Sequence, residues 1–521
     1  MSDTGTVFVG GGGEGYAQAQ ELLLKYANRH GLIAGATGTG KTVTLQILAE
    51  SFSNAGVPVF LADVKGDLSG LAKAGSADHK LHDKLIARSQ TIGFDDYGYD
   101  AFPVTFWDLY GQKGHPIRTT ISEIGPLLLA RLLELTEAQE GVLNIAFRVA
   151  DEEGLAILDM DDLRSLLIWI GENDDEISLR YGHIHRASLG TIQRQLLVLE
   201  NQGGAAFFGE PAIDLNDMMA TTPGGQGRIN VLAADKLMQA PRLYATFLMW
   251  ILSELFENLP EVGDPDKPKF VFFFDEAHLL FEDAPKSLVQ KIEQVARLIR
   301  SKGVGVYFIT QNPADVPDDI LGQLGNRVQH ALRAFTPRDQ KALRAAAETF
   351  RENPEFDTEE AIKSVGVGEA LVSLLEDKGI PSVVERTLIR PPSSQLGPID
   401  EVERAAVIAQ SPVAGLYEEV VNRESAHEIL NNRAEKAAAE AEAAEKAAEA
   451  AKEAEKREKL KVREFNSGST YSGSSSRKKT SRSSRSDSVG EVFAKSLARQ
   501  LGGRAGRSLV RGVLGSLFKG R

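Results

Sequence analysis

Eight residues near the N-terminus have the types and the spacing of a phosphate-binding loop. They fit the pattern G-x-x-x-x-G-K-[ST], and the order of apolar run, pattern and helix-like stretch argues against a chance glycine-rich turn. The glycines allow backbone N–H groups to face phosphate oxygens at the start of a helix. In this interpretation Lys41 reaches the β- and γ-phosphates of ATP, and Thr42 ligates Mg²⁺. The predicted nucleotide-binding residues are Gly35, Ala36, Thr37, Gly38, Thr39, Gly40, Lys41 and Thr42.

A second segment, FVFFFDEAHLLFED, places two adjacent carboxylates after an apolar run. Asp275 would hold Mg²⁺, and Glu276 would polarise the water that attacks the γ-phosphate. An ordinary strand-to-helix turn is the alternative for these residues alone, but the complete phosphate-binding loop in the same chain favours the catalytic interpretation. The next apolar run is followed by Gln311, whose side chain could sense the γ-phosphate.

These candidate residues need a parallel sheet to bring them together. Apolar runs alternate with amphipathic segments through residues 1–400, which predicts an α/β fold with a mostly parallel sheet and helices on both faces. Such sheets bind ligands at the carboxyl ends of their strands. The glycine-rich run Val9–Gly15 lacks G-K-[ST], so we expect a loop there, with a place near the nucleotide as an option. The predicted strands are Gly31–Gly35, Val57–Asp63, Val104–Trp107, Ile229–Ala233, Phe270–Phe274, Val304–Thr310 and Val328–Ala334.

Changes in composition along the chain predict several further parts. Residues 117–202 have helical periodicity, which indicates a helical insertion in the α/β core. The Ala/Glu/Lys-rich segment has high helix propensity but no apolar seam, as is typical of an exposed single helix. The predicted parts are a core at 1–116 and 203–400, a helical insertion at 117–202, a connecting helical segment at 401–432, an Ala/Glu/Lys-rich helix at 433–465, a Ser-rich disordered linker at 466–489 and a basic amphipathic tail at 490–521.

Charge is distributed unevenly along the chain. The formal net charge is −14, yet residues 477–521 hold twelve Lys and Arg against two acidic residues, so the rest of the chain carries about −24. A body this acidic is a poor general surface for nucleic acid, although net charge does not exclude a local basic channel. The tail has several interpretations: docking on its own protein or on a second subunit, binding to an anionic membrane, binding to nucleic acid, or disorder.

The sequence lacks several residue types and segments, and these absences indicate the cellular compartment of the protein. There is no cysteine, which excludes disulfides and Cys-ligated metals. No apolar run approaches the roughly 18–20 residues that span a bilayer, and the N-terminus lacks the pattern of a signal peptide. We therefore expect a cytoplasmic protein, with peripheral membrane contact through the tail as an option.

Four segments together carry a resemblance to a known superfamily. They are the phosphate-binding loop, the apolar run ending in Asp275-Glu276, the segment from Arg300 to Gln311, and LADVKGDLSG, whose Asp63, Lys65, Gly66 and Asp67 match an Asp-x-Lys-Gly-Asp pattern. Over roughly residues 1–400 the chain resembles the HerA–FtsK superfamily of RecA-like P-loop ATPases, and within it the bacterial HerA-like group of the YjgR type. The stretch ANRHGLIAGATGTGKT also resembles HerA, in which Arg-His precedes the strand of the loop.

The resemblance implies an ATP-driven machine. It implies a RecA-like P-loop NTPase core that uses ATP and Mg²⁺, a ring-shaped homo-hexamer, and a helicase-like motor or translocase acting on double-stranded DNA. The alternative is an ATP-dependent switch or scaffold that remodels protein or membrane partners without moving DNA. Stimulation of ATP turnover by DNA separates the two.

Three further residues join the candidate catalytic set through the resemblance. Arg29 and Arg300 would contact nucleotide across a subunit boundary, where an arginine stabilises charge on the transferring phosphoryl group. Surface ion pairs are the alternative for both arginines. Asp63 ends a predicted strand at the ligand edge of the sheet, with a helix cap or turn as its alternative role. The candidate catalytic residues are thus Glu276, Lys41, Gln311, Arg300, Arg29 and Asp63, and the candidate metal ligands are Thr42 and Asp275.

Two features depart from the patterns of other helicases. Residues 275–278 read DEAH, but DEAH-box helicases carry two RecA-like domains and we find one phosphate-binding domain, so we interpret the spelling as coincidence. HerA proteins place a small β-barrel before the motor domain. Because the phosphate-binding loop already begins at Gly35, we expect no such barrel and no docking of partners through one.

Overall fold

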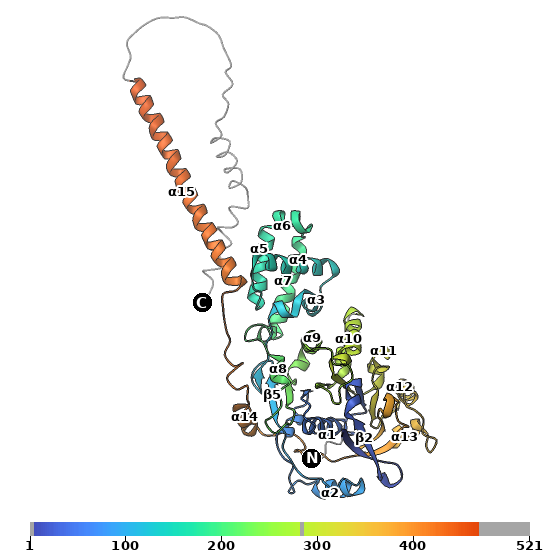
Figure 1. Ribbon diagram of the computed structural model, residues 1–521. Helices are drawn as coiled ribbons and strands as arrows, with labels where there is room; N and C mark the ends of the chain where they lie inside the picture. The colour runs from blue at the N-terminus through green and yellow to red at the C-terminus, as the bar shows by residue number, and fades with distance from the viewer. Residues whose placement is uncertain (1–4, 282–285, 468–521) are drawn as a thin grey trace. The chain divides into compact units, whose positions relative to one another are not determined.

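The computed structural model describes residues 5–281 and 286–467 (Figure 1). The predicted tail at 490–521, and all but the first two residues of the predicted linker at 466–489, lie outside the described residues. The chain divides into two compact units, the first ending at His427 and the second beginning at Glu428. All of the candidate catalytic residues belong to the first unit.

A single sheet, of twelve strands over the described residues, forms the centre of the first unit. Its order is β2-β1-β12-β11-β10-β3-β9-β8-β4-β7-β5-β6. All neighbours from β10 to β6 are parallel, whereas β2, β1, β12 and β11 add an antiparallel flank. The mostly parallel sheet confirms the predicted fold class. The strands are β1 Thr6–Gly12, β2 Gln18–Leu23, β3 Gly31–Ala34, β4 Val59–Asp63, β5 Val104–Asp108, β6 His115–Pro116, β7 Ile229–Ala233, β8 Phe270–Phe274, β9 Val304–Thr310, β10 Asn326–Gln329, β11 Glu369–Ser373 and β12 Glu385–Ile389.

Three adjacent parallel strands bring the candidate segments to one edge of the sheet. Strand β9 lies between β3, which leads into the phosphate-binding loop, and β8, which leads into the two carboxylates. In this register Ala34 pairs with Thr310, and Phe274 pairs with Phe308. Because the strands are parallel, their carboxyl ends meet at the same edge, where α/β sheets bind ligands.

One predicted strand differs from the structure by more than two residues at one end. The run predicted at Val328–Ala334 forms a strand at Asn326–Gln329 instead. The polar Asn326 and Arg327 begin the strand because their side chains donate hydrogen bonds to backbone carbonyls. The strand ends early because His330 turns into the space beside the phosphate-binding loop.

The loop predicted for Val9–Gly15 is wrong in its first part, because residues as far as Gly12 belong to β1. A Cβ at Gly10 or Gly11 would overlap a backbone carbonyl oxygen of a neighbouring segment. These glycines therefore allow close approach between backbones inside the sheet, a use of glycine that an apolar pattern does not report. The turn begins only at Gly13, whose φ is +69°.

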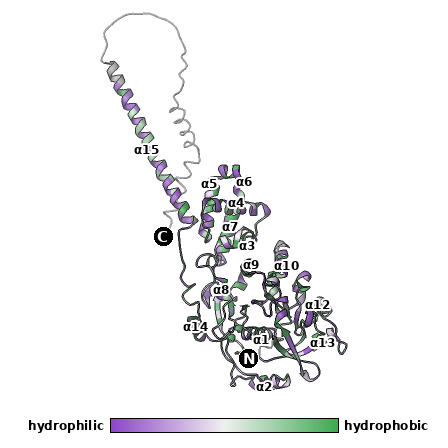
Figure 2. Ribbon diagram, viewed as in Figure 1, coloured by the Kyte–Doolittle hydropathy of each residue, from purple (hydrophilic) through white to green (hydrophobic). Residues whose placement is uncertain are grey.

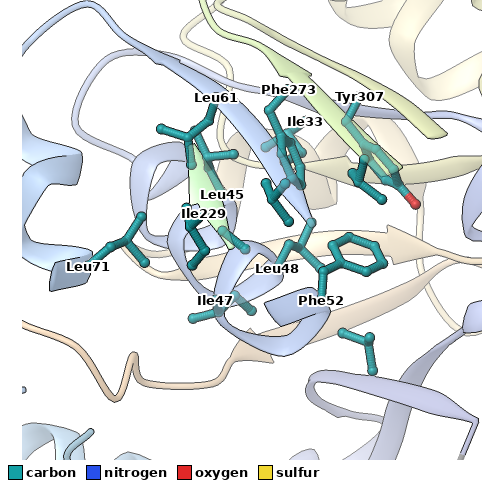
Figure 3. Close-up of a cluster of buried hydrophobic side chains, with 14 of the residues drawn as sticks. Ile33, Leu45, Ile47, Leu48, Phe52, Leu61, Leu71, Ile229, Phe273 and Tyr307 are labelled. Atoms are coloured by element: carbon teal, nitrogen blue, oxygen red, sulfur yellow. The ribbon is translucent and has the colours of Figure 1, made fainter. Parts of the chain in front are cut away.

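Helix α1, Lys41–Asn54, covers one face of the sheet. Its Leu45, Leu48 and Phe52 are buried in a cluster that includes Phe273 (Figure 3). The rings of Phe52 and Phe273 lie 6.2 Å apart between centroids. Burial of apolar surface, at roughly 25 cal/mol per Å², holds α1 on the sheet and thereby fixes the end of the phosphate-binding loop.

Helix α9, Pro241–Asn258, covers the opposite face. Its Phe247 ring lies 6.3 Å from Phe60, which in turn stacks on Phe272 at 4.5 Å. Successive side chains of a strand point to opposite faces, so Phe272 faces α9 and Phe273 faces α1. Burial of β8 on both sides explains why the run before the two carboxylates is apolar throughout.

A group of helices lies between β6 and β7 in the chain, where the sequence predicts a helical insertion (Figure 1). The first helix of this group, α3 Ile121–Leu132, begins with a capping box between Thr120 and Glu123 and packs against α9 of the core. The other helices of the first unit are α2 His82–Thr91, α3 Ile121–Leu132, α4 Glu137–Glu153, α5 Met160–Glu172, α6 Asp174–Tyr181, α7 Arg186–Asn201, α8 Leu215–Met218, α10 Lys286–Ile299, α11 Asp318–Leu321, α12 Pro337–Glu348, α13 Thr358–Ser364 and α14 Glu401–Ala409.

Helix α15, Ala426–Ser467, is 42 residues long and continues into the second unit. Residues 431–461 are exposed, and Figure 2 shows hydrophilic residues along much of the helix. Ion pairs one turn apart, such as Glu442 with Lys446, support the helix where it has no apolar face to bury. No helix in the described part of the chain is both long and apolar enough to cross a membrane.

Candidate active site

The phosphate-binding loop joins β3 to α1 through an unusual backbone path. The φ angles of Gly35, Gly38 and Gly40 are +151°, +79° and +121°, values that L side chains rarely adopt. Thr39 closes the loop, because its Oγ1 donates to the carbonyl of Ala36 at 2.7 Å. The glycines of the sequence pattern thus stand where the backbone requires them.

His330, which the sequence pattern did not single out, packs against this loop. A Cβ at Gly35 would collide with the His330 side chain, and one at Gly40 would lie 3.2 Å from its Cε1. The ring Nδ1 donates to the carbonyl of Glu369 at 2.9 Å, and Nε2 accepts from Thr44 Oγ1 at 2.8 Å. Burial lowers the pKa of His330 to about 4, so the imidazole is neutral at pH 7. A histidine directly after a strand is a weak sequence signal, and only the long-range contacts show its role.

Lys41 is 8% exposed and lies folded over its own loop. Its Nζ donates to the carbonyls of Gly35 at 2.6 Å and Ala36 at 3.3 Å. Burial lowers the pKa of the Lys41 ammonium, and the charge of Glu276 partly opposes this shift. Thr42 follows Lys41 in the first turn of α1. The two residues therefore lie beside the loop whose backbone would receive phosphate.

Asp275 and Glu276 follow β8 directly. Burial raises the pKa of Asp275 to about 6, and the adjacent charge of Glu276 adds to the effect. Glu276 is 6% exposed and has a left-handed backbone, with φ +48° and ψ +49°. This conformation costs a non-glycine residue about 1–3 kcal/mol, and such strain gathers at functional sites.

The Glu276 side chain is held by several partners. Its Oε1 lies 3.4 Å from Lys65 Nζ, while its Oε2 accepts from Gln311 Nε2 at 3.3 Å and lies 3.5 Å from His278 Nδ1. The Oε1 of Gln311 accepts in turn from Thr37 Oγ1 at 3.4 Å. Gln311 therefore links Glu276 to the phosphate-binding loop, so the structure brings these predicted residues together.

Asp63 is buried at the end of β4, and its carboxylate accepts hydrogen bonds within the turn that follows the strand. Its two oxygens accept from the backbone N–H groups of Gly66 at 2.7 Å and Leu68 at 3.1 Å. Burial raises the pKa of Asp63 to about 7, with the charge of Asp67 adding to the effect. This geometry matches the turn that the sequence left open as an alternative, and it shapes the segment that carries Lys65.

Arg29 and Arg300 lie together, but away from the phosphate-binding loop of the same chain. Both pair with Asp264, with Nη2 of Arg300 at 3.2 Å and Nη2 of Arg29 at 3.7 Å from its carboxylate oxygens. They precede β9 and β3, so they belong to the amino ends of strands whose carboxyl ends carry the loop. A strand as long as β9 spans roughly 20 Å at about 3.3 Å per residue. The structure therefore does not bring the arginines to the loop within one subunit.

The candidate metal ligands provide the donors that Mg²⁺ prefers. Thr42 offers a hydroxyl and Asp275 a carboxylate, and both are hard oxygen donors. The raised pKa of Asp275 arises because its carboxyl group is buried beside a second one. A cation at this place would favour the ionised carboxylate. The residues fit a complex of Mg²⁺ with the nucleotide phosphates.

Residues 12–521 match the family described as Helicase HerA-like C-terminal. The chain belongs to this family. Together with the phosphate-binding loop and the buried carboxylates, this membership confirms the predicted HerA–FtsK-type relationship and makes the chain a P-loop ATPase.

The HerA-like chain is also similar to several named proteins. It is 22% identical over 364 residues to the DNA double-strand break repair helicase HerA of Sulfolobus acidocaldarius, covering 68% of this chain and 63% of that protein. It is 29% identical over 172 residues to a probable helicase of Methanocaldococcus jannaschii, covering 30% of this chain and 32% of that one. Among solved structures it is similar to VirB4 of Thermoanaerobacter pseudethanolicus, at 14% identity with a TM-score of 0.49, covering 77% and 99% of the two chains. The chain thus spans less than two thirds of the length of these two helicase relatives.

Proposed function

We propose that the chain is a Mg²⁺-dependent ATP hydrolase that assembles as a ring-shaped homo-hexamer and translocates on or unwinds double-stranded DNA. The observation that carries the hydrolase part is the hydrogen-bonded path from Glu276 through Gln311 to Thr37 of the phosphate-binding loop. This path supports the proposal, because it links a buried carboxylate to the loop that would bind the γ-phosphate, where the carboxylate could polarise the attacking water.

In this proposal each residue of the carboxyl edge has a distinct task. Backbone N–H groups of the loop and the ammonium of Lys41 bind the β- and γ-phosphates. Thr42 and Asp275 hold Mg²⁺, which neutralises charge on the phosphates when bound. Glu276 accepts a proton from the attacking water, and Gln311 orients that water through its link to the loop.

The place of the two arginines supports the proposal of a ring. An arginine supplied by a neighbouring subunit stabilises charge on the transferring phosphoryl group. The side chains of Arg29 and Arg300 are 22% and 41% exposed at the amino edge of the sheet. In a head-to-tail ring this edge would face the carboxyl edge of the next subunit and complete its site. The number of six subunits is what the resemblance to the HerA–FtsK superfamily implies.

The DNA part of the proposal draws on the relative from Sulfolobus acidocaldarius, which is named as a DNA double-strand break repair helicase. We expect duplex DNA to stimulate ATP turnover several-fold, and the mass of the assembly to equal six chains. ATP turnover with and without duplex DNA, measured together with the mass, tests both expectations. ATP turnover that duplex DNA does not change would favour an ATP-dependent switch or scaffold for protein or membrane partners. A fully active monomer would rule out the ring. A cytoplasmic location remains a prediction.

A further inference from the structure

Lys65 is brought to the catalytic carboxylate by a turn that its neighbours fix. Strand β4 pairs directly with β8, and the register that joins Leu61 to Phe273 sets Asp63 level with Asp275. Beyond β4, the carboxylate of Asp63 holds the turn through the N–H groups of Gly66 and Leu68. Gly66 has φ +79°, which lets the chain reverse immediately after Lys65.

The contact of Lys65 with Glu276 complements the contact of Gln311. The ammonium of Lys65 lies 3.4 Å from Oε1 of Glu276, while Gln311 donates to Oε2. The carboxylate is thus held at both oxygens by groups from two different strand ends. Glu276 needs such support because its left-handed backbone sets an unusual starting direction for the side chain.

We propose that Lys65 is a positioning residue that fixes Glu276 for the attack of water on ATP. This inference rests on the proposed role of Glu276. The side chain of Lys65 is 47% exposed whereas the side chain of Glu276 is 7% exposed, so the lysine reaches in from the surface. Misplacing a catalytic group by about 1 Å can cost on the order of 10²-fold in rate. A direct contact of Lys65 with the γ-phosphate is the competing role.

Lys65→Met separates these two roles, and Lys73→Met is its matched control. Lys73 is 48% exposed and forms an ion pair with Glu403 outside the site. For Lys65→Met we expect kcat to fall by about 10–100-fold, with KM and the directly measured Kd for an ATP analogue unchanged within about twofold. Lys65→Arg should recover most of kcat, because it restores a cation at Oε1. Lys73→Met should match the wild type.

A double variant decides whether Lys65 acts through Glu276. In single-turnover assays Lys65→Met should add no loss to Glu276→Gln, since the carboxylate that the lysine positions is already absent. A further loss in the double variant, or ATP binding weakened about tenfold in Lys65→Met, would assign Lys65 to the phosphate and overturn the inference. Wild-type kcat in Lys65→Met would overturn it as well. If Glu276→Gln alone turns over ATP like the wild type, it is the proposed function that fails.

Discussion

The two edges of the parallel sheet are built in different ways. At the carboxyl edge, Glu276 is buried and hydrogen-bonded through Gln311 to the phosphate-binding loop. At the amino edge, Arg29 and Arg300 share one carboxylate, that of Asp264, which is 57% exposed. Exposed ion pairs are worth about 0–1 kcal/mol, so the arginines can exchange this partner at little cost. The side chains at the first edge are held by their own chain, whereas the second edge has partly exposed charged groups, which the proposed ring assigns to contact with another subunit.

The largest expected effect comes from the fixed edge. Glu276→Gln should reduce ATP turnover by about 10²–10⁴-fold, the usual loss when a general base is removed. The amide is nearly isosteric, so the fold and ATP binding should remain. Steady-state turnover and ATP-analogue binding measure the two properties separately.

Lys41→Ala is the comparison for that variant. It removes the charge that faces the β- and γ-phosphates, so it should lose ATP binding as well as turnover. If Glu276→Gln also lost binding, the carboxylate would belong to the structure of the loop and not to the chemical step.

The exposed edge should respond in a way that depends on neighbouring subunits. Arg300→Ala should lower turnover by about 10-fold or more, since an arginine acting in trans supplies a large part of the phosphoryl stabilisation. Mixing Arg300→Ala with Glu276→Gln should restore some activity. Mixed rings contain interfaces in which an intact Glu276 meets an intact Arg300 of the next subunit.

Subunit exchange is the control for this mixing experiment. Exchange can be followed by mixing differently labelled wild-type rings before the variants are combined. No recovery in rings that demonstrably exchange subunits would place Arg300 in a surface ion pair, the alternative open from the sequence. The two edges would then not meet.

The carboxyl edge could be predicted because its chemistry lies in short contiguous patterns. The loop from Gly35 to Thr42 needs its glycines, lysine and hydroxyl at fixed spacing, and Asp275-Glu276 needs only the buried run before it. A parallel sheet then brings strand ends together whatever the length of chain between them. These patterns predict a mostly parallel sheet but not its strand order, and they do not predict the antiparallel flank of β2, β1, β12 and β11.

The remaining features depend on contacts between residues far apart in sequence. Gly10 is needed because another strand passes close by, which a local pattern reports only as a flexible run. His330 supports the loop across almost 300 residues, through Gly35 and Thr44. Asp264 comes from an irregular segment with no motif, yet it joins Arg29 to Arg300. Side-chain partners of this kind require the folded arrangement and not the local sequence.

A smaller effect is expected from Asp264→Asn. Removing the shared carboxylate should free both arginines to bind the phosphates of the nucleotide in a neighbouring subunit. Because each of the two ion pairs is worth at most about 1 kcal/mol, ATP affinity should rise by no more than about 5-fold for each arginine that is freed. The matched control is Asp377→Asn, which breaks the exposed ion pair with Lys25. Weaker ATP binding in Asp264→Asn alone would show that the carboxylate holds the arginines in their working position.

The smallest effect on ATP turnover at neutral pH should come from replacing two buried histidines, one near each edge of the sheet. His30 near the amino edge contacts the carbonyl of Ala296 at 2.6 Å and accepts from the N–H of Val306, and His330 packs against the phosphate-binding loop. Burial lowers the pKa of both to about 4, below the usual 6.5. Between pH 6.5 and 4 the unfolded chain therefore binds protons that the folded chain does not, so stability falls as the pH falls through this window.

Replacing either histidine with Asn should make unfolding less sensitive to acid. Each shift corresponds to roughly 3 kcal/mol at most, at 1.36 kcal/mol per pKa unit. Denaturant unfolding at pH 7 and 4.5 should show the stability gap between wild type and each variant narrowing at the lower pH. His183→Asn, at an exposed histidine, should leave the pH dependence of unfolding as it is in the wild type.

The histidines at the two edges should differ in their effect on ATP binding, since His330 packs against Gly35 whereas His30 has its partners at the other end of the sheet. At pH 7 only His330→Asn should weaken ATP binding; an equal loss in His30→Asn would mean that the two edges are coupled within one subunit.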